Sequence, residues 1–234
     1  MTENIFSRLH LLVGDDALKA FEKTKVIIFG IGGVGSWCAE ALVRSTVKNI
    51  TIVDSDYICE TNINRQLPAT TKTVGKIKAD VLKERLLEIN PAANIKSIHK
   101  FYTAENSSEF ELSDYDYVID AIDSVKEKAH LINTVTRLKN TKLFSSMGAA
   151  LKMDIFKIKK SEFWKIKGDP LARALRNNFK RSKIFPEKKF QCIWSDEARK
   201  NIVESNLRIN GTITHTTATF GFALANLLID DIIK

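Results

Sequence analysis

A glycine-rich turn directly after a short apolar run is the feature that most constrains the fold of this chain. Residues 25–30 read Lys-Val-Ile-Ile-Phe-Gly, and an apolar run that ends in glycine is typical of a strand buried on both faces of a parallel sheet. The glycines of the turn are Gly30, Gly32, Gly33 and Gly35. Glycine lets backbone approach a phosphate closely, and the helix expected over residues 36–44 would present free N–H groups and a positive dipole end to an anion. The pattern predicts a nucleotide-binding turn.

The remaining hydrophobic pattern alternates strands with helices. Strands are expected over residues 50–53, 95–99, 117–120 and 143–146, and helices over residues 76–90 and 126–139. This alternation predicts an α/β fold, Rossmann-like and doubly wound, with a mostly parallel sheet.

The pattern changes after about residue 150. Residues 152–160 alternate apolar and charged side chains, which predicts an antiparallel strand with one wet face. A basic helix over 170–181, a strand over 190–194 and a helix over 217–233 complete the chain. No Pro-rich or Gly/Ser-rich linker is visible, so we expect residues 1–234 to form a single domain. It would have a nucleotide-binding core over 1–150 and an antiparallel C-terminal extension over 151–234.

Composition limits the class of protein. Hydrophobic residues make up 44% of the chain, which is too many for a disordered protein, and the net charge of +8 favours a polyanionic partner. Three scattered cysteines and no CxxC pair exclude a disulfide framework and the usual structural zinc site. The longest apolar segment, 220–229, is about half of the roughly 20 residues that a membrane span needs. We therefore expect a soluble cytoplasmic protein with no membrane partner.

A carboxylate follows the second predicted strand. Asp54 stands where an acidic side chain can hydrogen-bond a ribose hydroxyl. The glycines and Asp54 by themselves indicate NAD as readily as ATP, and a glycine turn that only packs a helix on a strand is the remaining alternative.

Polar residues downstream of Asp54 favour a triphosphate. They are Asp56, Asn62, Arg65, Gln66 and Lys78. Arg65 and Lys78 are two cations that suit a phosphate chain and the charge that develops on it. The alternative is a solvated polar loop, with Lys78 on the wet face of a helix.

A second acidic pair follows the strand expected over 117–120. Carboxylates at the carboxyl ends of strands face the ligand crevice of an open α/β sheet, so Asp123 is a candidate Mg²⁺ ligand that would act together with phosphate oxygens. Asp120 could instead cap the following turn, and a capping role for both residues stays open.

Taken in order, these motifs resemble the adenylating domain of the ubiquitin-activating-enzyme superfamily, which includes the molybdopterin and thiamine sulfur-carrier adenylyltransferases. The resemblance rests on the glycine turn, Asp54-x-Asp56, Asn62-x-Asn64-Arg65-Gln66, Lys78 and Asp120-x-x-Asp123. It implies ATP and Mg²⁺ as cofactors, Asp54 on the ribose and Asp123 on the metal ion. It implies that the phosphates are bound by Asn62, Arg65, Gln66 and Lys78. It also implies a homodimer with shared active sites, in which Arg8 completes the neighbouring subunit's site, so that the catalytic set is Arg8, Arg65, Lys78 and Asp123.

A narrower resemblance covers nearly the whole chain. Outside the ATP-binding motifs, three segments are similar to the tRNA threonylcarbamoyladenosine dehydratases: Asp169-Pro170-Leu171-Ala172, Cys192-Ile193-Trp194-Ser195-x-Glu197 and residues 217–222. This resemblance implies a ligase-type cyclase that adenylates the threonylcarbamoyl carboxylate beside the anticodon, releases pyrophosphate and AMP, and leaves the cyclic form. Trp194 departs from the apolar residue usual there, and residues 201–214 match no motif of the family.

Two other functions stay open. One is the adenylation of the C-terminus of a ubiquitin-like sulfur carrier, although the bacterial members usually carry two CxxC pairs. The other is a dinucleotide-binding protein that does not adenylate. The basic helix over 170–181 and the lysines around it are the candidate tRNA surface within the C-terminal extension, and solvated charge is the alternative. A sulfur-transfer protein is a further possible partner, while Cys192 is expected to be a core residue more readily than a catalytic one.

Overall fold

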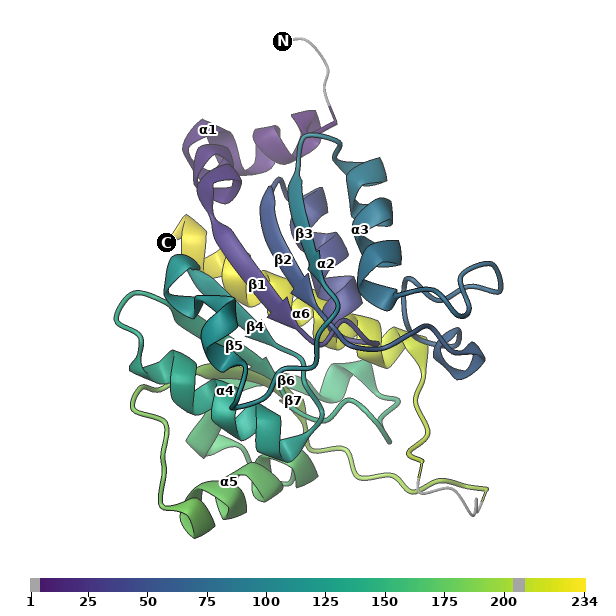
Figure 1. The fold of residues 1–234 in the computed structure, drawn as a ribbon, viewed down its shortest axis with the longest axis vertical. Helices are drawn as coiled ribbons and strands as arrows, with labels where there is room; N and C mark the ends of the chain where they lie inside the picture. The colour runs from purple at the N-terminus through teal and green to yellow at the C-terminus, as the bar shows by residue number, and fades with distance from the viewer. Residues whose placement is uncertain (1–4, 204–208) are drawn as a thin grey trace.

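The strands expected between residues 25 and 146 are all present in the computed structural model, which describes residues 5–203 and 209–234 (Figure 1). The strands are β1 (Lys25–Phe29), β2 (Asn49–Val53), β3 (Asn94–Ile98), β4 (Tyr117–Asp120), β5 (Lys142–Ser146), β6 (Ile158–Glu162) and β7 (Gln191–Ser195). The helices are α1 (Ser7–Lys23), α2 (Gly35–Arg44), α3 (Lys78–Ile89), α4 (Val125–Arg137), α5 (Pro170–Ser182) and α6 (Thr214–Ile233).

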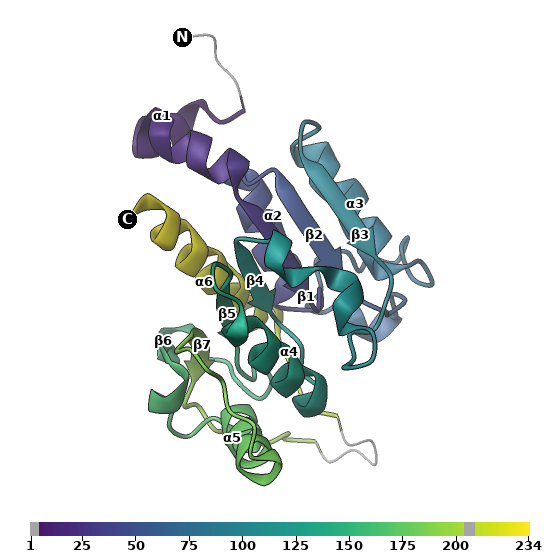
Figure 2. The ribbon, with the colours of Figure 1, turned by 60° about the vertical axis from the view of Figure 1, so that its left-hand side comes forward.

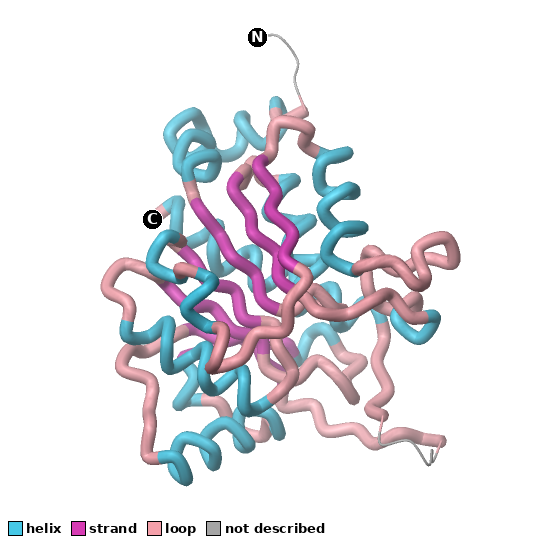
Figure 3. Tube along the Cα trace, viewed as in Figure 1, coloured by secondary structure: helices cyan, strands magenta, loops and turns pink. Residues whose placement is uncertain are grey.

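The seven strands form one sheet in the order β3-β2-β1-β4-β5-β7-β6. Every neighbouring pair is parallel except β6 with β7. The predicted fold class, a doubly wound and mostly parallel α/β sheet with an antiparallel element near the C-terminus, is therefore confirmed. Because β7 pairs with β5, the C-terminal extension continues the same sheet (Figure 3).

Helices cover both faces of the sheet, and this explains the continuous apolar run in β1. Val26 and Ile28 belong to the core on the face of α2, α3 and α6, whereas Ile27 and Phe29 belong to the core on the face of α4 and α5 (Figure 2). Side chains alternate between the two faces of a strand, so a strand covered on both faces must be apolar at every position.

The structure adds one helix that was not predicted and changes the limits of one predicted strand. Helix α1 was not predicted from the sequence, because Gly14, with φ of 79° and ψ of 176°, kinks the helix and interrupts its hydrophobic periodicity. The wet strand expected over 152–160 is wrong in its limits, since strand structure begins only at Ile158. Before it, Asp154 caps a 3₁₀ turn by accepting a hydrogen bond from the Phe156 N–H, and Lys152 is buried instead of wet.

Helix α6 is long and apolar enough, by length and composition alone, to cross a membrane, yet it lies within the core. Phe220, Leu224 and Leu228 are fully buried in the cluster that α6 shares with α2 and the sheet. Close contact with α2 depends on Gly221, because a Cβ there would lie 2.5 Å from the Val34 carbonyl oxygen and 2.8 Å from the Trp37 Cβ. The apolar character of α6 thus follows from packing.

The contact between α2 and α6 can be tested by Gly221→Ala. A Cβ at this position overlaps backbone atoms, so α6 has to move away from α2. We expect a net loss of roughly 1–3 kcal/mol in the free energy of unfolding, in spite of the better helix propensity of alanine. Thermal and urea unfolding followed by circular dichroism would measure it.

The matched control is Gly148→Ala, where the nearest atoms to a Cβ are 3.8 and 3.9 Å away. This variant should unfold close to the wild type. A Gly221→Ala protein that melts at or above the wild-type temperature would contradict the packing described for α6.

Candidate functional site

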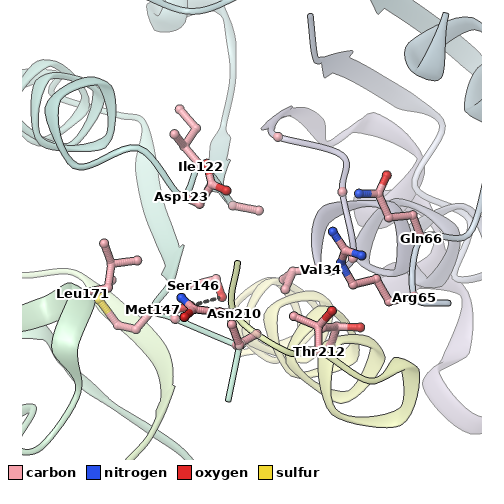
Figure 4. A pocket seen from close by; sticks show the side chains of 18 of the residues that line it. Val34, Arg65, Gln66, Ile122, Asp123, Ser146, Met147, Leu171, Asn210 and Thr212 are labelled. Carbon is pink, nitrogen blue, oxygen red and sulfur yellow. Dashed lines mark hydrogen bonds between the residues drawn. The ribbon is translucent and has the colours of Figure 1, made fainter. Parts of the chain in front are cut away.

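A cavity of about 910 Å³ opens at the carboxyl ends of β1, β2, β4 and β5. Ligands of open α/β sheets bind at this edge, where the strand order reverses. The volume lies near the upper end of the roughly 300–1,000 Å³ common for small-molecule sites. Arg65 and Gln66 lie on one side of the cavity, and Ile122 and Asp123 lie on the opposite side (Figure 4).

The glycine turn forms the floor between these sides. Gly30 has a φ of +79°, and a Cβ there would lie 2.7 Å from the Ala121 carbonyl oxygen. A Cβ on Gly35 would lie 1.9 Å from the Gly30 carbonyl oxygen, so α2 can start here only from glycine. Gly32 and Gly33 line the cavity, and their backbone N–H groups donate to no acceptor within the described residues. These free donors beside the start of α2 are suited to phosphate oxygens.

Asp54 joins the glycine turn to the end of β2. Its carboxylate accepts hydrogen bonds from the Ile31 N–H and the Asp56 N–H, each at 2.9 Å. The ammonium of Lys78, in the first turn of α3, lies 3.4 Å from Asp54 Oδ1 and 2.8 Å from Asp56 Oδ2. The Lys78 side chain is only 2% exposed, so the alternative of a wet helix face is wrong.

Arg65 and Gln66 are placed by the turn that follows the 3₁₀ segment Glu60–Asn62. The Arg65 guanidinium donates to the Thr61 carbonyl oxygen at 2.8 Å and to Asn64 Oδ1 at 2.9 Å. Arg65 and Gln66 line the cavity. Gln66 is buried, and its Oε1 has no hydrogen-bond partner among the described residues.

Asn62 does not line this cavity. Its Oδ1 accepts a hydrogen bond from the Cys59 N–H at 3.2 Å, and its carbonyl oxygen accepts from the Gln66 N–H at 2.9 Å. In this structure Asn62 therefore shapes the turn that presents Arg65 and Gln66, and direct phosphate contact by Asn62 stays a prediction.

Asp123 follows β4 and lines the cavity with an exposed side chain. Within the described residues no set of three or more His, Cys, Asp and Glu side chains could hold a metal ion without a ligand. Mg²⁺ commonly takes only one or two carboxylates and completes its shell with substrate phosphates and water. A single open carboxylate opposite Arg65 fits that donor set.

A buried ion pair lies beneath Asp123. Lys128, on α4, places its ammonium 2.8 Å from Asp120 Oδ2, and both side chains are fully buried. The same ammonium donates to the Ile122 carbonyl oxygen, and Asp120 accepts from the Ser145 hydroxyl and from the Ile122 N–H. Asp120 thus caps its turn, as one alternative proposed, and the network holds the backbone that carries Asp123. The burial of Lys128 could have been predicted from the sequence, because Lys128 lies on the apolar face of an amphipathic helix.

A second network forms the wall of the cavity contributed by the C-terminal third. The ammonium of buried Lys152 donates to the carbonyl oxygens of Ser195 and Glu197, each at 2.9 Å, and lies 4.0 Å from Asp169 Oδ2. Burial lowers the pKa of Lys152, and the Asp169 and Glu197 carboxylates act in the opposite direction. Burial likewise raises the pKa of Asp169, which caps α5 by accepting from the Ala172 N–H. The burial of Lys152 was not predictable from its place in an alternating segment of apolar and charged residues.

The remaining candidates lie away from the cavity. Arg8 is exposed on α1, and α1 lies at the end of the sheet opposite to the carboxyl ends of the strands (Figure 1). Cys192 is fully buried in the core between β7 and the face of α4 and α5, and burial raises the pKa of its thiol well above the usual range. A thiol held protonated there fits the expected core role.

Comparison with known proteins finds a family model and several relatives that match most of this chain. The sequence profile of the ThiF family matches residues 6–234. The tRNA threonylcarbamoyladenosine dehydratase of Haemophilus influenzae is 36% identical over 247 residues, covering 99% of this chain and 94% of that protein. The enzyme of the same name from Bacillus subtilis is 40% identical over 193 residues, covering 82% of this chain and 75% of that protein. The crystal structure of E. coli tRNA N6-threonylcarbamoyladenosine dehydratase in complex with ATP superimposes with a TM-score of 0.88 at 36% identity, covering 97% of this chain and 93% of that chain.

The buried ion pair beneath Asp123 can be tested by Lys128→Met. Removing the ammonium leaves the buried Asp120 carboxylate without its counter-ion, and we expect the free energy of unfolding to fall by about 3–5 kcal/mol. Urea unfolding without nucleotide would measure it. The double variant Asp120→Asn, Lys128→Met removes both charges and should recover part of the loss. Two single losses that simply add in the double variant would show that the pair is not coupled.

Proposed function

The chain belongs to the ThiF family, and from that premise we propose that it is an ATP-dependent tRNA threonylcarbamoyladenosine dehydratase. The observation that carries this proposal is the cavity itself. One opening brings the glycine turn, Arg65, Lys78 and Asp123 together with a wall built from the C-terminal third of the chain. The ATP complex of the E. coli dehydratase, which shares the fold over nearly the whole chain, supports ATP as the cofactor.

ATP binding follows from the groups that remain free. The N–H groups of Gly32 and Gly33 would bind phosphate oxygens, and Asp54 would accept a hydrogen bond from the ribose. The Lys78 ammonium has three N–H donors, of which Asp54 and Asp56 engage two, so one is left for a phosphate oxygen. Asp123 and the phosphates would hold Mg²⁺, which supplies charge neutralisation at the triphosphate.

The first chemical step is adenylation of the substrate. A carboxylate oxygen of the threonylcarbamoyl group attacks the α-phosphorus of ATP, the bond to the β-phosphate breaks, and pyrophosphate leaves with the electron pair. Negative charge accumulates on the phosphates during this step, and Arg65 and Lys78 would stabilise it. The product is a mixed anhydride with AMP, whose carbonyl carbon is now electrophilic.

The second step closes the ring. A nitrogen of the same modified nucleoside attacks the activated carbonyl and loses its proton, and AMP leaves with the former carboxylate oxygen. The oxygen of the eliminated water therefore ends on AMP. Because nucleophile and electrophile belong to one small group, effective molarities on the order of 10⁵ M are available, and a cysteine nucleophile is not needed.

The outer face of α5 is the proposed tRNA surface. Ala172, Leu175 and Phe179 are buried, so Arg173, Lys180 and Arg181 point away from the core. Arg176 is committed elsewhere, since it donates to the Ile166 carbonyl oxygen and lies over the Phe163 ring. The exposed cations would bind backbone phosphates, with an affinity that falls as salt rises.

We further propose a cytoplasmic homodimer. Arg8 does not line the cavity of its own chain, which fits a contribution to the partner subunit's ATP. The proposed single domain keeps residues 1–150 as the nucleotide-binding part and 151–234 as the extension that meets tRNA. A docking sulfur-transfer protein stays a prediction.

The reaction can be tested with purified protein, ATP, Mg²⁺ and tRNA that carries threonylcarbamoyladenosine. We expect pyrophosphate release together with loss of one water from the modified nucleoside, measured by mass spectrometry of digested tRNA. Asp123→Asn should be folded and inactive, because its side chain is exposed and has no role in packing. Pyrophosphate release with a ubiquitin-like carrier protein instead of tRNA would favour sulfur-carrier adenylation. No pyrophosphate release with either substrate would favour a nucleotide-binding protein that does not adenylate.

The shared site can be tested by mixing Arg8→Ala with Asp123→Ala. Each variant alone should be inactive, but a mixed dimer has one site in which Asp123 is intact and the partner supplies Arg8. An equimolar, freely exchanging mixture should regain about one quarter of wild-type activity, since half of the dimers are mixed and each has one good site. Activity that stays at the level of the separate variants, with exchange verified by labelled subunits, would remove Arg8 from the site.

A further inference from the structure

The cavity has a second half that the proposed nucleotide contacts do not involve. The nucleotide half is formed by lining residues within 29–34, 53–56 and 65–66, together with Lys78 and Asp123. The other half is formed by residues 147–152, Leu171 and residues 197–199. We call this second part the C-terminal wall; Figure 4 shows Met147 and Leu171 of it, across from Arg65. Under the proposed function, the modified adenosine has to enter beside ATP, and the C-terminal wall is the free surface that it would meet.

The C-terminal wall is held by reciprocal buried bonds. The Lys152 ammonium binds the Ser195 and Glu197 carbonyl oxygens, and in return the Glu197 carboxylate accepts hydrogen bonds from the N–H groups of Met153 and Asp154, at 2.8 and 2.9 Å. The Glu197 side chain is only 5% exposed. These contacts fix the segment after β7 against the segment after β5, so a side chain that Glu197 orients has a rigid base.

Glu197 orients Arg199. The Nε atom of Arg199 donates to Glu197 Oε1, and this hydrogen bond, together with those from the Asp154 and Met153 N–H groups, lowers the pKa of Glu197 to about 2. The carboxylate is therefore ionised and the pair is charged at neutral pH. Glu197 is the last residue of the segment Cys192-Ile193-Trp194-Ser195-x-Glu197. Its contacts give this segment a structural role, and none of the reaction steps described above involves it.

The rest of the Arg199 guanidinium is available. The side chain is 51% exposed and lines the cavity, and within the described residues its two terminal nitrogens have no hydrogen-bond partner. Guanidinium groups present a planar set of donors that matches carboxylate and phosphate oxygens, often through two parallel hydrogen bonds. None of the partners of Arg199 belongs to the nucleotide half.

We propose that Arg199, held by Glu197, binds an anionic group of the RNA substrate, either the carboxylate of the modified adenosine or a backbone phosphate beside it. This inference rests on the proposed function and adds to it the residue that positions the acceptor. A carboxylate held there would be oriented before it meets the α-phosphorus. A phosphate held there would instead fix the backbone around the modified nucleotide.

The test is Arg199→Gln in the full chain, compared with Lys200→Gln as a matched control. Lys200 is the exposed neighbouring cation and does not line the cavity. Losing a charge-assisted contact should raise KM for the modified tRNA by about 10- to 100-fold in Arg199→Gln, with KM for ATP unchanged. Arg199→Lys should recover part of the affinity, and Lys200→Gln should behave as the wild type.

Binding measurements distinguish the two anions. With a non-hydrolysable ATP analogue present, the affinities of modified and unmodified tRNA are compared in wild type and Arg199→Gln. If Arg199→Gln loses affinity only for modified tRNA, Arg199 binds the carboxylate. If it loses affinity equally for modified and unmodified tRNA, Arg199 binds a backbone phosphate.

Two results would overturn the inference. An unchanged KM for tRNA in a folded Arg199→Gln protein means that Arg199 does not touch the substrate, and a raised KM for ATP means that it belongs to the nucleotide half. A wild-type protein that makes no cyclic product would be a failure of the proposed function instead, so the two failures are distinguishable.

Discussion

The contact between Gly35 and the carbonyl oxygen of Gly30 is the constraint on which the rest of the site depends. An atom at the Cβ position of Gly35 would lie 1.9 Å from that oxygen, so α2 can begin immediately above the end of β1 only because there is no side chain. This closeness leaves the N–H groups of Gly32 and Gly33 at the cavity. It also brings Ile31 within reach of Asp54, whose carboxylate in turn engages Lys78. A bulkier residue at position 35 would displace the turn and with it each of these contacts.

Charges buried around the cavity set its shape in two places. Lys128 and Asp120 hold the turn before Asp123, and Lys152 and Glu197 hold the C-terminal wall. In both networks a lysine binds a backbone carbonyl oxygen as well as lying near a carboxylate. An uncompensated charge in the interior is costly, so each network holds its backbone in the one arrangement that satisfies all of its members. The open carboxylate of Asp123 and the open guanidinium of Arg199 are both attached to backbone fixed in this way.

The sheet could be predicted well from the sequence because each of its strands has a recognisable local pattern of apolar residues. Burial on both faces makes β1 apolar at successive positions, and parallel strands bring their carboxyl ends to one edge, so the glycine turn, Asp54 and Asp123 could be expected together. Helix α1 was not predictable in the same way, since Gly14 breaks its period. Arg65 and Gln66 could be named from their order along the chain, whereas the role of Asn62 in shaping the turn depends on the fold of residues 59–66.

The residues that sequence reasoning missed share a physical reason. Lys152 looks like one more lysine in an alternating segment, because its hydrogen-bond partners lie 43 and 45 residues further along the chain. The sequence around position 152 does not indicate that β7 pairs with β5, and it is this pairing that brings Ser195 and Glu197 beside Lys152. Arg199 likewise gains its orientation from a carboxylate that is itself fixed by residues 153 and 154. In this fold the nucleotide half of the cavity can therefore be predicted from local motifs. The half that would bind the RNA substrate forms only when distant segments of the chain pair, so local motifs do not predict it.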